Sequence, residues 1–286
     1  MPIIEVYPDF SALAAAAAQH YVRVADAAMT ERGVFTVALA GGSTPAGLYR
    51  LLAEPAWAAQ VNWAKTLIFF GDERCVPPDH PWSNYRMARE ALLDHVPLPQ
   101  GNIYRMAGEL PPADATADYA GALRRAFDLR GAARPVFDLI LLGMGDDGHT
   151  ASLFPGMPAL RERRRLVVAT DVPGYVQPAV PRLTLTFPVL NAARHVMFLV
   201  AGAGKAQKVR AVFGAGQVAD ADLPDLPDLA FSSALRISEH PERSTASVRR
   251  AQSQDASSPA ALVHPTAGQL TWLLDRAAAR FTLKAP

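Results

Sequence analysis

Cysteine is almost absent from the chain, because Cys75 is the only one in 286 residues. A single thiol cannot form an intrachain disulfide, and it cannot build a cysteine cage around a metal. We therefore expect a protein of a reducing compartment, cytoplasmic by default. A folded chain of this size removes roughly three quarters of its unfolded surface from water, so no disulfide or metal is needed to hold it together.

Long apolar runs are also absent. A helix that spans a bilayer needs about 20 apolar residues. The nearest candidate is the alanine-rich stretch at 13–18, which runs directly into Gln19 and His20. It lacks the basic start of a targeting segment and is typical of an amphipathic helix. We expect no membrane partner.

Neither sign of charge is in large excess. The formal net charge is +1, and 50% of the residues are hydrophobic while 19% are charged, which is the balance of an ordinary globular protein. Lysine is scarce, with four residues against twenty-four arginines. Nothing in this balance favours binding to nucleic acid.

Short apolar runs alternate with helical patterns along the chain. The runs that predict strands are residues 3–6, 35–40, 66–70, 137–142, 183–187 and 195–200. The segments with helical spacing are residues 10–32, 45–53, 84–96, 113–129, 205–213 and 269–281, with Asp9 as the expected cap of the first. This alternation predicts an α/β protein whose parallel sheet has helices on both faces.

One region departs from this regularity. Residues 217–259 are rich in Asp, Pro, Ser and Arg and show little periodicity. We expect a partly mobile surface excursion from a single domain that spans residues 1–286, rather than a second domain.

The first candidate site is Gly41-Gly42-Ser43-Thr44-Pro45, between a predicted strand and a predicted helix. Glycines let the backbone turn tightly and approach a ligand, and Pro45 suits the first helical position with Thr44 as the cap. The unpaired N–H groups of such a helix start favour a phosphate, and the two hydroxyls add donors. An ordinary capped turn without a ligand explains the segment equally well.

The second candidate is Gly71-Asp72-Glu73-Arg74, which follows the strand at 66–70. An open α/β sheet binds its ligand at the carboxyl ends of the strands. Arg74 at that place suits a carboxylate, a phosphate or a developing oxyanion. A surface salt-bridge cluster is the alternative, and this segment alone does not decide between them.

The third candidate is Gly143-Met144-Gly145-Asp146-Asp147-Gly148-His149-Thr150, directly after the most apolar strand. The density of glycine indicates an unusual backbone path that a plain connector does not need. We expect His149 to lie at the crevice, where an imidazole suits proton transfer near neutral pH. Either Asp146 or Asp147 is placed to orient the ring, and the sequence does not choose.

Two other chemistries are disfavoured at this segment. Asp146, Asp147 and His149 lie too close in sequence to surround a metal without help, and no second His-rich segment exists. Ser152 is a candidate nucleophile, but the chain lacks a Gly-x-Ser-x-Gly elbow. We therefore expect no metal.

Together the segments resemble those of the 6-phosphogluconolactonases in order, spacing and placement. The similarity extends through Pro81-Trp82-Ser83-Asn84-Tyr85, Arg182-Leu183-Thr184-Leu185-Thr186 and Thr271-Trp272-Leu273-Leu274-Asp275, and so covers nearly the whole chain outside 217–259. The resemblance implies a Rossmann-like, doubly wound, mostly parallel sheet. It also implies hydrolysis of 6-phosphogluconolactone in the oxidative pentose phosphate pathway, with no required cofactor.

The resemblance further implies roles for individual residues. His149 is expected over the lactone carbonyl as the catalytic base, beside Asp147, with Asp72 and Arg74 at the sugar end of the pocket. The phosphate is expected among Gly42, Ser43, Thr44, Arg182 and Lys205. The segment Ala201-Gly202-Ala203-Gly204 before Lys205 departs from the family pattern, where a Thr-Gly is expected, and this weakens the assignment of Lys205.

Two rival functions stay open at this stage. A glucosamine-6-phosphate deaminase shares the Asp-Gly-His turn, but that family continues with Phe-Asn-Glu-Pro, whereas Thr150-Ala151-Ser152-Leu153-Phe154-Pro155 stands here. A non-catalytic sugar-phosphate-sensing domain would ordinarily carry a DNA-binding segment, whereas this chain enters its first predicted strand at Ile3. We expect a monomer or a small homo-oligomer acting on a small sugar phosphate.

Overall fold

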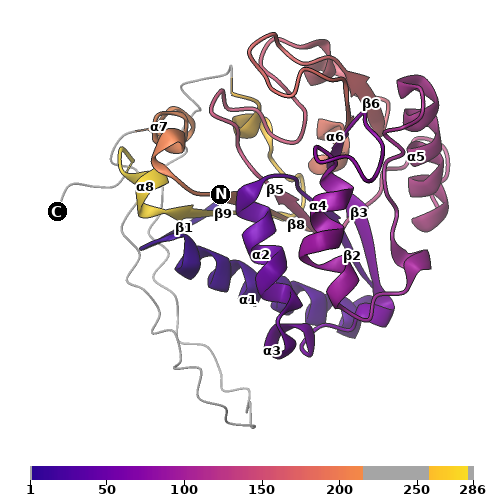
Figure 1. Cartoon of the computed structure of the whole chain (residues 1–286), viewed down its shortest axis with the longest axis horizontal. Coiled ribbons are helices and arrows are strands. Elements are labelled where there is room, and N and C mark those ends of the chain that lie inside the picture. Colours follow the sequence, from indigo (N-terminus) through magenta and orange to yellow (C-terminus); the bar gives the residue numbers. More distant parts are fainter. Residues whose placement is uncertain (1, 215–257, 283–286) are drawn as a thin grey trace.

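The computed structural model describes residues 2–214 and 258–282, so most of the predicted excursion at 217–259 lies outside the described residues. A six-stranded sheet forms the centre of the molecule, and each neighbouring pair in it is parallel (Figure 1). Its strands, in spatial order, are β1 (Ile3–Tyr7), β9 (Gln269–Asp275), β8 (His195–Val200), β5 (Leu139–Leu142), β2 (Phe35–Leu39) and β3 (Thr66–Phe70).

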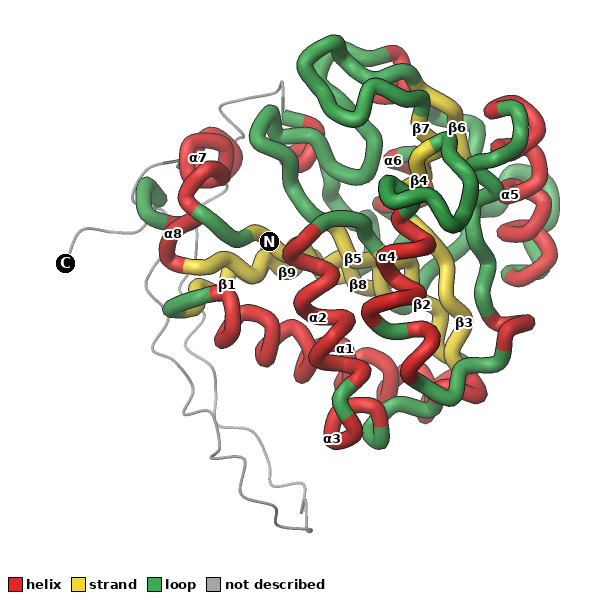
Figure 2. Tube along the Cα trace, in the orientation of Figure 1, coloured by secondary structure: helices red, strands yellow, loops and turns green. Residues whose placement is uncertain are grey.

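Successive residues of each central strand pack into different cores. In β5, Leu139 and Leu141 belong to one core, whereas Ile140 and Leu142 belong to the other. The first core is covered by α1 (Phe10–Arg32), α2 (Ser43–Ala53), α3 (Pro55–Ala58) and α4 (Asn84–Ala91). The second is covered by α5 (Pro112–Ala126), α6 (Phe187–Leu190), α7 (Ala206–Phe213) and α8 (Arg276–Ala279). Figure 2 shows α2 and α4 in front of the sheet, with α1 running along its lower side. The predicted three-layer, doubly wound fold is confirmed.

A second, antiparallel sheet lies beyond the carboxyl end of β3. It consists of β4 (Asp72–Arg74), β7 (Arg182–Leu185) and β6 (Val167–Thr170), with β7 in the middle. Gly71 joins the two sheets, because its N–H donates to Leu39 O and its carbonyl accepts from Leu185 N. The sequence predicted only a strand at 183–187, so β4 and β6 were missed.

Two helix predictions have different outcomes. Asp9 caps α1 as predicted, and its side chain accepts from Ala12 N at 2.9 Å. The prediction that Thr44 caps α2 is wrong, because the helix already begins at Ser43. Gly42 occupies the cap position with a φ of 106°, and no side chain caps the helix. Since this backbone geometry suits glycine, the helix starts at Ser43, two residues before the Pro45 start that a Thr44 cap implies.

The predicted helix at 269–281 is also wrong. Residues 269–275 form β9, between β1 and β8, and only the short helix α8 follows. Trp272 stacks on Phe198 of β8 with 3.8 Å between ring centroids, while Leu273 packs into the opposite core. A strand that is buried on both faces shows a continuous apolar run, and periodicity does not separate such a run from a buried helix.

The chain changes direction across the sheet between β2 and β5. After β2 it proceeds to β3 on one side, whereas after β5 it proceeds to β8 on the other. At such a switch point the connections leave the sheet in opposite directions and open a crevice at the carboxyl ends of the strands. The glycine-rich segments that begin at Gly41 and Gly143 follow these two strands, so both candidate turns border that crevice.

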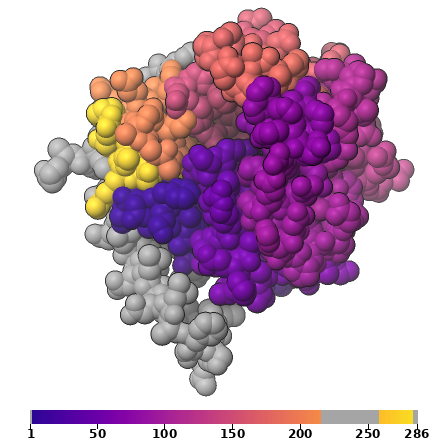
Figure 3. Space-filling model, viewed as in Figure 1, coloured from indigo at the N-terminus to yellow at the C-terminus, as the bar shows by residue number. Residues whose placement is uncertain are grey.

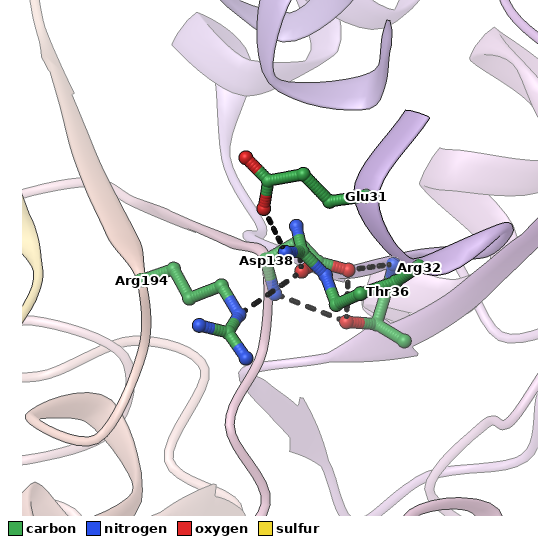
Figure 4. Close-up of polar contacts among 5 residues, drawn as sticks. All are labelled: Glu31, Arg32, Thr36, Asp138 and Arg194. Carbon is green, nitrogen blue, oxygen red and sulfur yellow. Dashed lines mark hydrogen bonds and ion pairs between the residues drawn. The ribbon is translucent and has the colours of Figure 1, made fainter. Parts of the chain in front are cut away.

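A buried polar cluster lies at the other end of the strands, away from the crevice (Figure 4). Asp138 precedes β5, and its Oδ2 accepts from Thr36 N and Thr36 Oγ1 of β2, both at 2.8 Å. Its Oδ1 pairs with Arg32 Nη2 at 2.9 Å and with Arg194 Nε at 3.5 Å. This carboxylate joins α1, β2, β5 and the start of β8 at the end of the sheet away from the crevice.

No helix among the described residues is both long and apolar enough to cross a bilayer.

Candidate active site

Four connections meet where neighbouring strands of the central sheet end. They follow β8, β5, β2 and β3, which are adjacent in that order. Two contacts join three of them. Between the connections after β8 and β5, Lys205 Nζ lies 2.6 Å from Asp146 Oδ1. Between those after β5 and β3, Ser152 Oγ donates to Asp72 Oδ2 at 2.6 Å. In Figure 3, the purple, pink and orange parts of the chain meet on one face. All three predicted motifs therefore border one region.

His149 is held by Asp147. The ring Nδ1 lies 2.6 Å from Asp147 Oδ1, and the same oxygen accepts from the backbone N–H of His149 at 3.0 Å. A Cβ on Gly145 would lie 2.2 Å from the ring atoms Cε1 and Nδ1, so that glycine makes room for the imidazole. Between the two aspartates that the sequence left open, Asp147 is the one that orients the ring.

The contact also decides which ring nitrogen is basic. Because an ionised carboxylate only accepts hydrogen bonds, His149 Nδ1 carries the hydrogen and Nε2 carries the lone pair. Partial burial opposes ionisation of Asp147, but the hydrogen bonds from the His149 side chain and backbone, together with one from Tyr175, bring the pKa of this carboxyl well below its usual range. Asp147 is therefore an anion at neutral pH. The imidazole is partly exposed (27% of the side chain) and packs against Phe154.

Asp146 points to a different partner from Asp147. Its carboxylate pairs with Lys205, which follows β8, and 79% of its side chain is exposed. The two neighbouring aspartates thus have different partners, because Asp147 contacts His149 and Asp146 pairs with Lys205. Among residues 2–214 and 258–282, no three His, Cys, Asp or Glu side chains are grouped as metal ligands.

Asp72 lies in a buried hydrogen-bond network. Besides the bond from Ser152 Oγ, Asn84 Nδ2 donates to the backbone carbonyl of Asp72 at 3.0 Å. Ser152 is 1% exposed, and its backbone N–H donates to Thr184 Oγ1. Its hydroxyl is therefore a buried donor to a carboxylate, not a nucleophile presented to the crevice. The network joins the loop of His149 to β4 and β7.

Sequence reasoning missed the role of Glu73. This side chain is 2% exposed, and its two oxygens accept from the backbone N–H groups of Arg74, Asn84 and Tyr85 and from Ser83 Oγ, at 2.7 to 3.0 Å. Burial raises the pKa of Glu73 in spite of these bonds. Glu73 therefore fixes the start of α4 against β4. The sequence offered only a weak signal for this contact, because Glu73 and Ser83 are ten residues apart and the fold brings them together.

Arg74 and Arg182 are direct neighbours across the β4–β7 pair. Arg182 is 3% exposed, and its Nη2 donates to Pro178 O at 2.9 Å, while no described residue accepts from its buried Nη1. Burial and the nearby Arg74 lower the pKa of Arg182 to about 10. Two guanidinium groups side by side, one with an open buried donor, favour an anion between or beside them.

The start of α2 supplies further donors. Gly42 and Ser43 are exposed and Thr44 is partly exposed, and within residues 2–214 and 258–282 no side chain caps the first N–H groups of the helix. Such unpaired N–H groups at the positive end of a helix dipole attract phosphate. The structure thus places Gly42, Ser43 and Thr44 at the end of β2, beside the connection that carries His149 after β5.

Known proteins resemble this chain in sequence and in fold. Residues 8–227 match the model of the glucosamine-6-phosphate isomerases/6-phosphogluconolactonase family. A 6-phosphogluconolactonase of Nostoc is 38% identical over 276 residues, covering 96% of each chain. One of Homo sapiens is 38% identical over 281 residues, covering 97% of this chain and 93% of that one. The solved 6-phosphogluconolactonase of Trypanosoma cruzi superposes with a TM-score of 0.76 at 28% identity, over 98% of this chain and 96% of that one. The chain therefore belongs to the glucosamine-6-phosphate isomerase/6-phosphogluconolactonase family.

Proposed function

We propose that this chain hydrolyses 6-phospho-D-glucono-1,5-lactone to 6-phosphogluconate, with His149 as the general base. Relatives that match nearly its whole length are named 6-phosphogluconolactonases. The observation that carries the residue assignment is the 2.6 Å contact between His149 Nδ1 and Asp147 Oδ1, at the switch point of the sheet. It leaves Nε2 as the free basic nitrogen of a partly exposed ring.

The proposed reaction is a direct hydrolysis. His149 Nε2 takes a proton from water as the water oxygen attacks the lactone carbonyl carbon. The resulting imidazolium donates that proton to the ring oxygen as the carbon–oxygen bond breaks, so one water is consumed and the imidazole is regenerated. Asp147 holds the ring and stabilises its positive charge while it is protonated.

Binding of the phosphate positions the carbonyl against the base. We assign this role to the start of α2 at Gly42, Ser43 and Thr44, together with Arg182 and Lys205. Arg182 is supported by its buried, open Nη1. Lys205 would exchange Asp146 for the phosphate, since the two anions compete for one ammonium group. A bound phosphate turns the attack into a reaction of fixed geometry.

At the sugar end we assign different roles to Arg74 and Asp72. Arg74 is partly exposed, and Nη1 donates to Trp82 O at 2.5 Å, so its other donors are available to a developing oxyanion. Asp72 accepts a short bond from Ser152 and is 8% exposed. We therefore propose that Asp72 binds and orients groups of the site rather than transferring a proton.

The activity is tested by making the lactone in situ from glucose 6-phosphate and following acid release against the spontaneous background. Turnover well above that background supports the proposal, and a rate equal to the background contradicts it. A parallel assay with the unphosphorylated lactone tests the anion site, because the loss of phosphate contacts should lower kcat/KM strongly. Ammonia release from glucosamine 6-phosphate, without lactone hydrolysis, would instead identify a deaminase.

The setting of the enzyme is part of the same proposal. We propose a cytoplasmic enzyme, as a monomer or a small homo-oligomer, that acts on its sugar phosphate without a cofactor or a nucleic-acid partner. Size-exclusion chromatography with light scattering tests the oligomeric state.

A further inference from the structure

A folded hairpin connection joins β6 to β7 next to the site. Residues 171–181 leave and re-enter the small sheet at the paired residues Thr170 and Arg182. Within the connection, Val176 N donates to Pro173 O at 2.8 Å. At its base, Arg182 Nη2 donates to Pro178 O and Cys75 N donates to Pro181 O, both at 2.9 Å. The connection is thus tied to the strand that carries Arg182.

At its far end the connection touches the catalytic pair. Tyr175 is 64% exposed, yet its hydroxyl donates to Asp147 Oδ2 at 3.0 Å. The other oxygen of this carboxylate, Oδ1, already accepts two hydrogen bonds from His149. Both oxygens of Asp147 are therefore occupied, one by the histidine and one by a tyrosine 28 residues away in the sequence.

We propose that Tyr175 is a positioning residue for lactone hydrolysis, which holds the Asp147 carboxylate in the plane that aims His149 Nε2 at the substrate. This inference rests on the proposed function. A carboxylate with partners on only one oxygen turns about its terminal bond, and the imidazole turns with it. A donor on the second oxygen fixes the plane, as outer partners do for catalytic and metal-binding histidines.

The chemistry of the tyrosine suits this role. Partial covering by the protein and the bond to the Asp147 carboxylate raise the pKa of Tyr175. The phenol therefore stays protonated through the neutral and mildly alkaline range and remains a donor. A hydrogen bond to Oδ2 also makes the carboxylate a weaker base, so that the proton of Nδ1 stays on His149 during the reaction.

The same connection reaches the proposed phosphate site. Its base is Arg182, whose guanidinium is bonded to Pro178 O within the connection. The connection therefore contacts residues that we assign to both ends of the substrate. Tyr175 contacts Asp147, which holds the base at the reacting carbonyl. Pro178 contacts Arg182, which we assign to the phosphate. Tyr175 acts on the base and not on the phosphate, so its loss should lower kcat and leave KM nearly unchanged.

The first test is Tyr175→Phe in the full chain, which keeps the ring and removes only the hydroxyl. We expect kcat to fall about two- to tenfold, the effect of losing one hydrogen bond, with an unchanged melting temperature because the residue is exposed. Tyr104→Phe is the matched control, since the Tyr104 ring stacks on Phe69 in the core. An unchanged kcat for Tyr175→Phe, or a change confined to KM, overturns the proposal.

Two readouts separate positioning from a general structural role. In an Asp147→Asn background, Tyr175→Phe should cause no further loss of kcat, whereas an equal loss in both backgrounds contradicts action through Asp147. The low-field proton resonance of His149 Nδ1–H should shift in Tyr175→Phe and not in Tyr104→Phe, and an unmoved resonance overturns the proposal. This resonance does not depend on substrate. The two proposals can therefore fail separately. A wild-type chain without lactonase activity would refute the proposed function, whereas an unmoved resonance would refute the positioning role of Tyr175.

Discussion

Ser152 Oγ donates a 2.6 Å hydrogen bond to Asp72 Oδ2, and both side chains are buried. The bond joins the segment that carries His149, after β5, to the segment that carries Arg74, after β3. These segments are 80 residues apart in the sequence. The relative position of the base and of the proposed oxyanion donor therefore depends on a contact that neither of them makes itself.

Replacement of Ser152 tests this connection. Ser152→Ala leaves a buried carboxylate oxygen without its donor, which should lower the free energy of unfolding by about 1–3 kcal/mol. We also expect a several-fold loss of kcat, because the base and the oxyanion donor lose their common support. Urea unfolding and steady-state assays measure the two effects. Thr116→Ala, at a partly exposed position of α5, is the control. Wild-type stability and rate in Ser152→Ala would contradict the account.

Arg182→Lys tests the anion site. Lysine keeps the charge but loses the planar, forked donors of arginine. The loss of a charged hydrogen bond, about 1.5–3 kcal/mol, should lower kcat/KM for the phosphorylated lactone by one to two orders of magnitude. The unphosphorylated lactone should be affected much less. An equal fall for both lactones would show that Arg182 supports the fold of the hairpin rather than the phosphate.

The ionisation of Asp147 gives a dependence of stability on pH. Its folded pKa lies below the usual value of a free aspartate, which is about 3.9. A depressed folded pKa stabilises the protein above the unfolded pKa, and this contribution disappears as the pH falls through the folded pKa. The stability difference between wild type and Asp147→Asn should therefore be full at pH 7 and shrink below about pH 4. Urea unfolding at several pH values measures it, and a constant difference would refute the assignment.

The Asp138 cluster, at the end of the strands away from the crevice, should contribute to stability and not to catalysis. Asp138 is 3% exposed, and it pairs with Arg32 and accepts two bonds from Thr36. Asp138→Ala leaves the buried Thr36 N–H and hydroxyl without their acceptor, at a cost of about 1–3 kcal/mol, and removes the partner of Arg32, whose side chain is 27% exposed. The kcat per folded molecule should stay near that of wild type, because the cluster lies away from the crevice. Glu31→Gln, at an exposed position beside it, is the control for charge. A large fall in kcat of the folded Asp138→Ala protein would contradict this separation.

The sequence predicted the structure best where a strand is followed directly by a motif with functional side chains. Strands at 35–40, 66–70 and 195–200 were predicted within one residue of their observed bounds. The turns after β2, β3 and β5 meet because the carboxyl ends of parallel strands lie at one edge. The positions of His149, Asp72 and Gly42 relative to the sheet followed from this rule. Asp147 could not be chosen over Asp146, because that choice depends on side-chain rotamers rather than on spacing.

What the sequence did not predict depends on contacts between distant segments. β9 was taken for a helix because burial on both faces leaves no polar stripe to reveal its period. The small antiparallel sheet was missed because β4 and β6 are short and gain their pairing only from β7. Tyr175 stood in a segment with no motif, and only the fold brings its hydroxyl to Asp147.

The most direct test of the central claim is the rate of lactone hydrolysis by His149→Ala, corrected for the spontaneous reaction. Loss of a general base should reduce kcat by about a hundred- to ten-thousand-fold, with the folded state retained because the ring is partly exposed. His264→Ala, which removes an exposed imidazole elsewhere, should keep the wild-type rate. A His149→Ala enzyme that turns over the lactone at nearly the wild-type rate would contradict the mechanism.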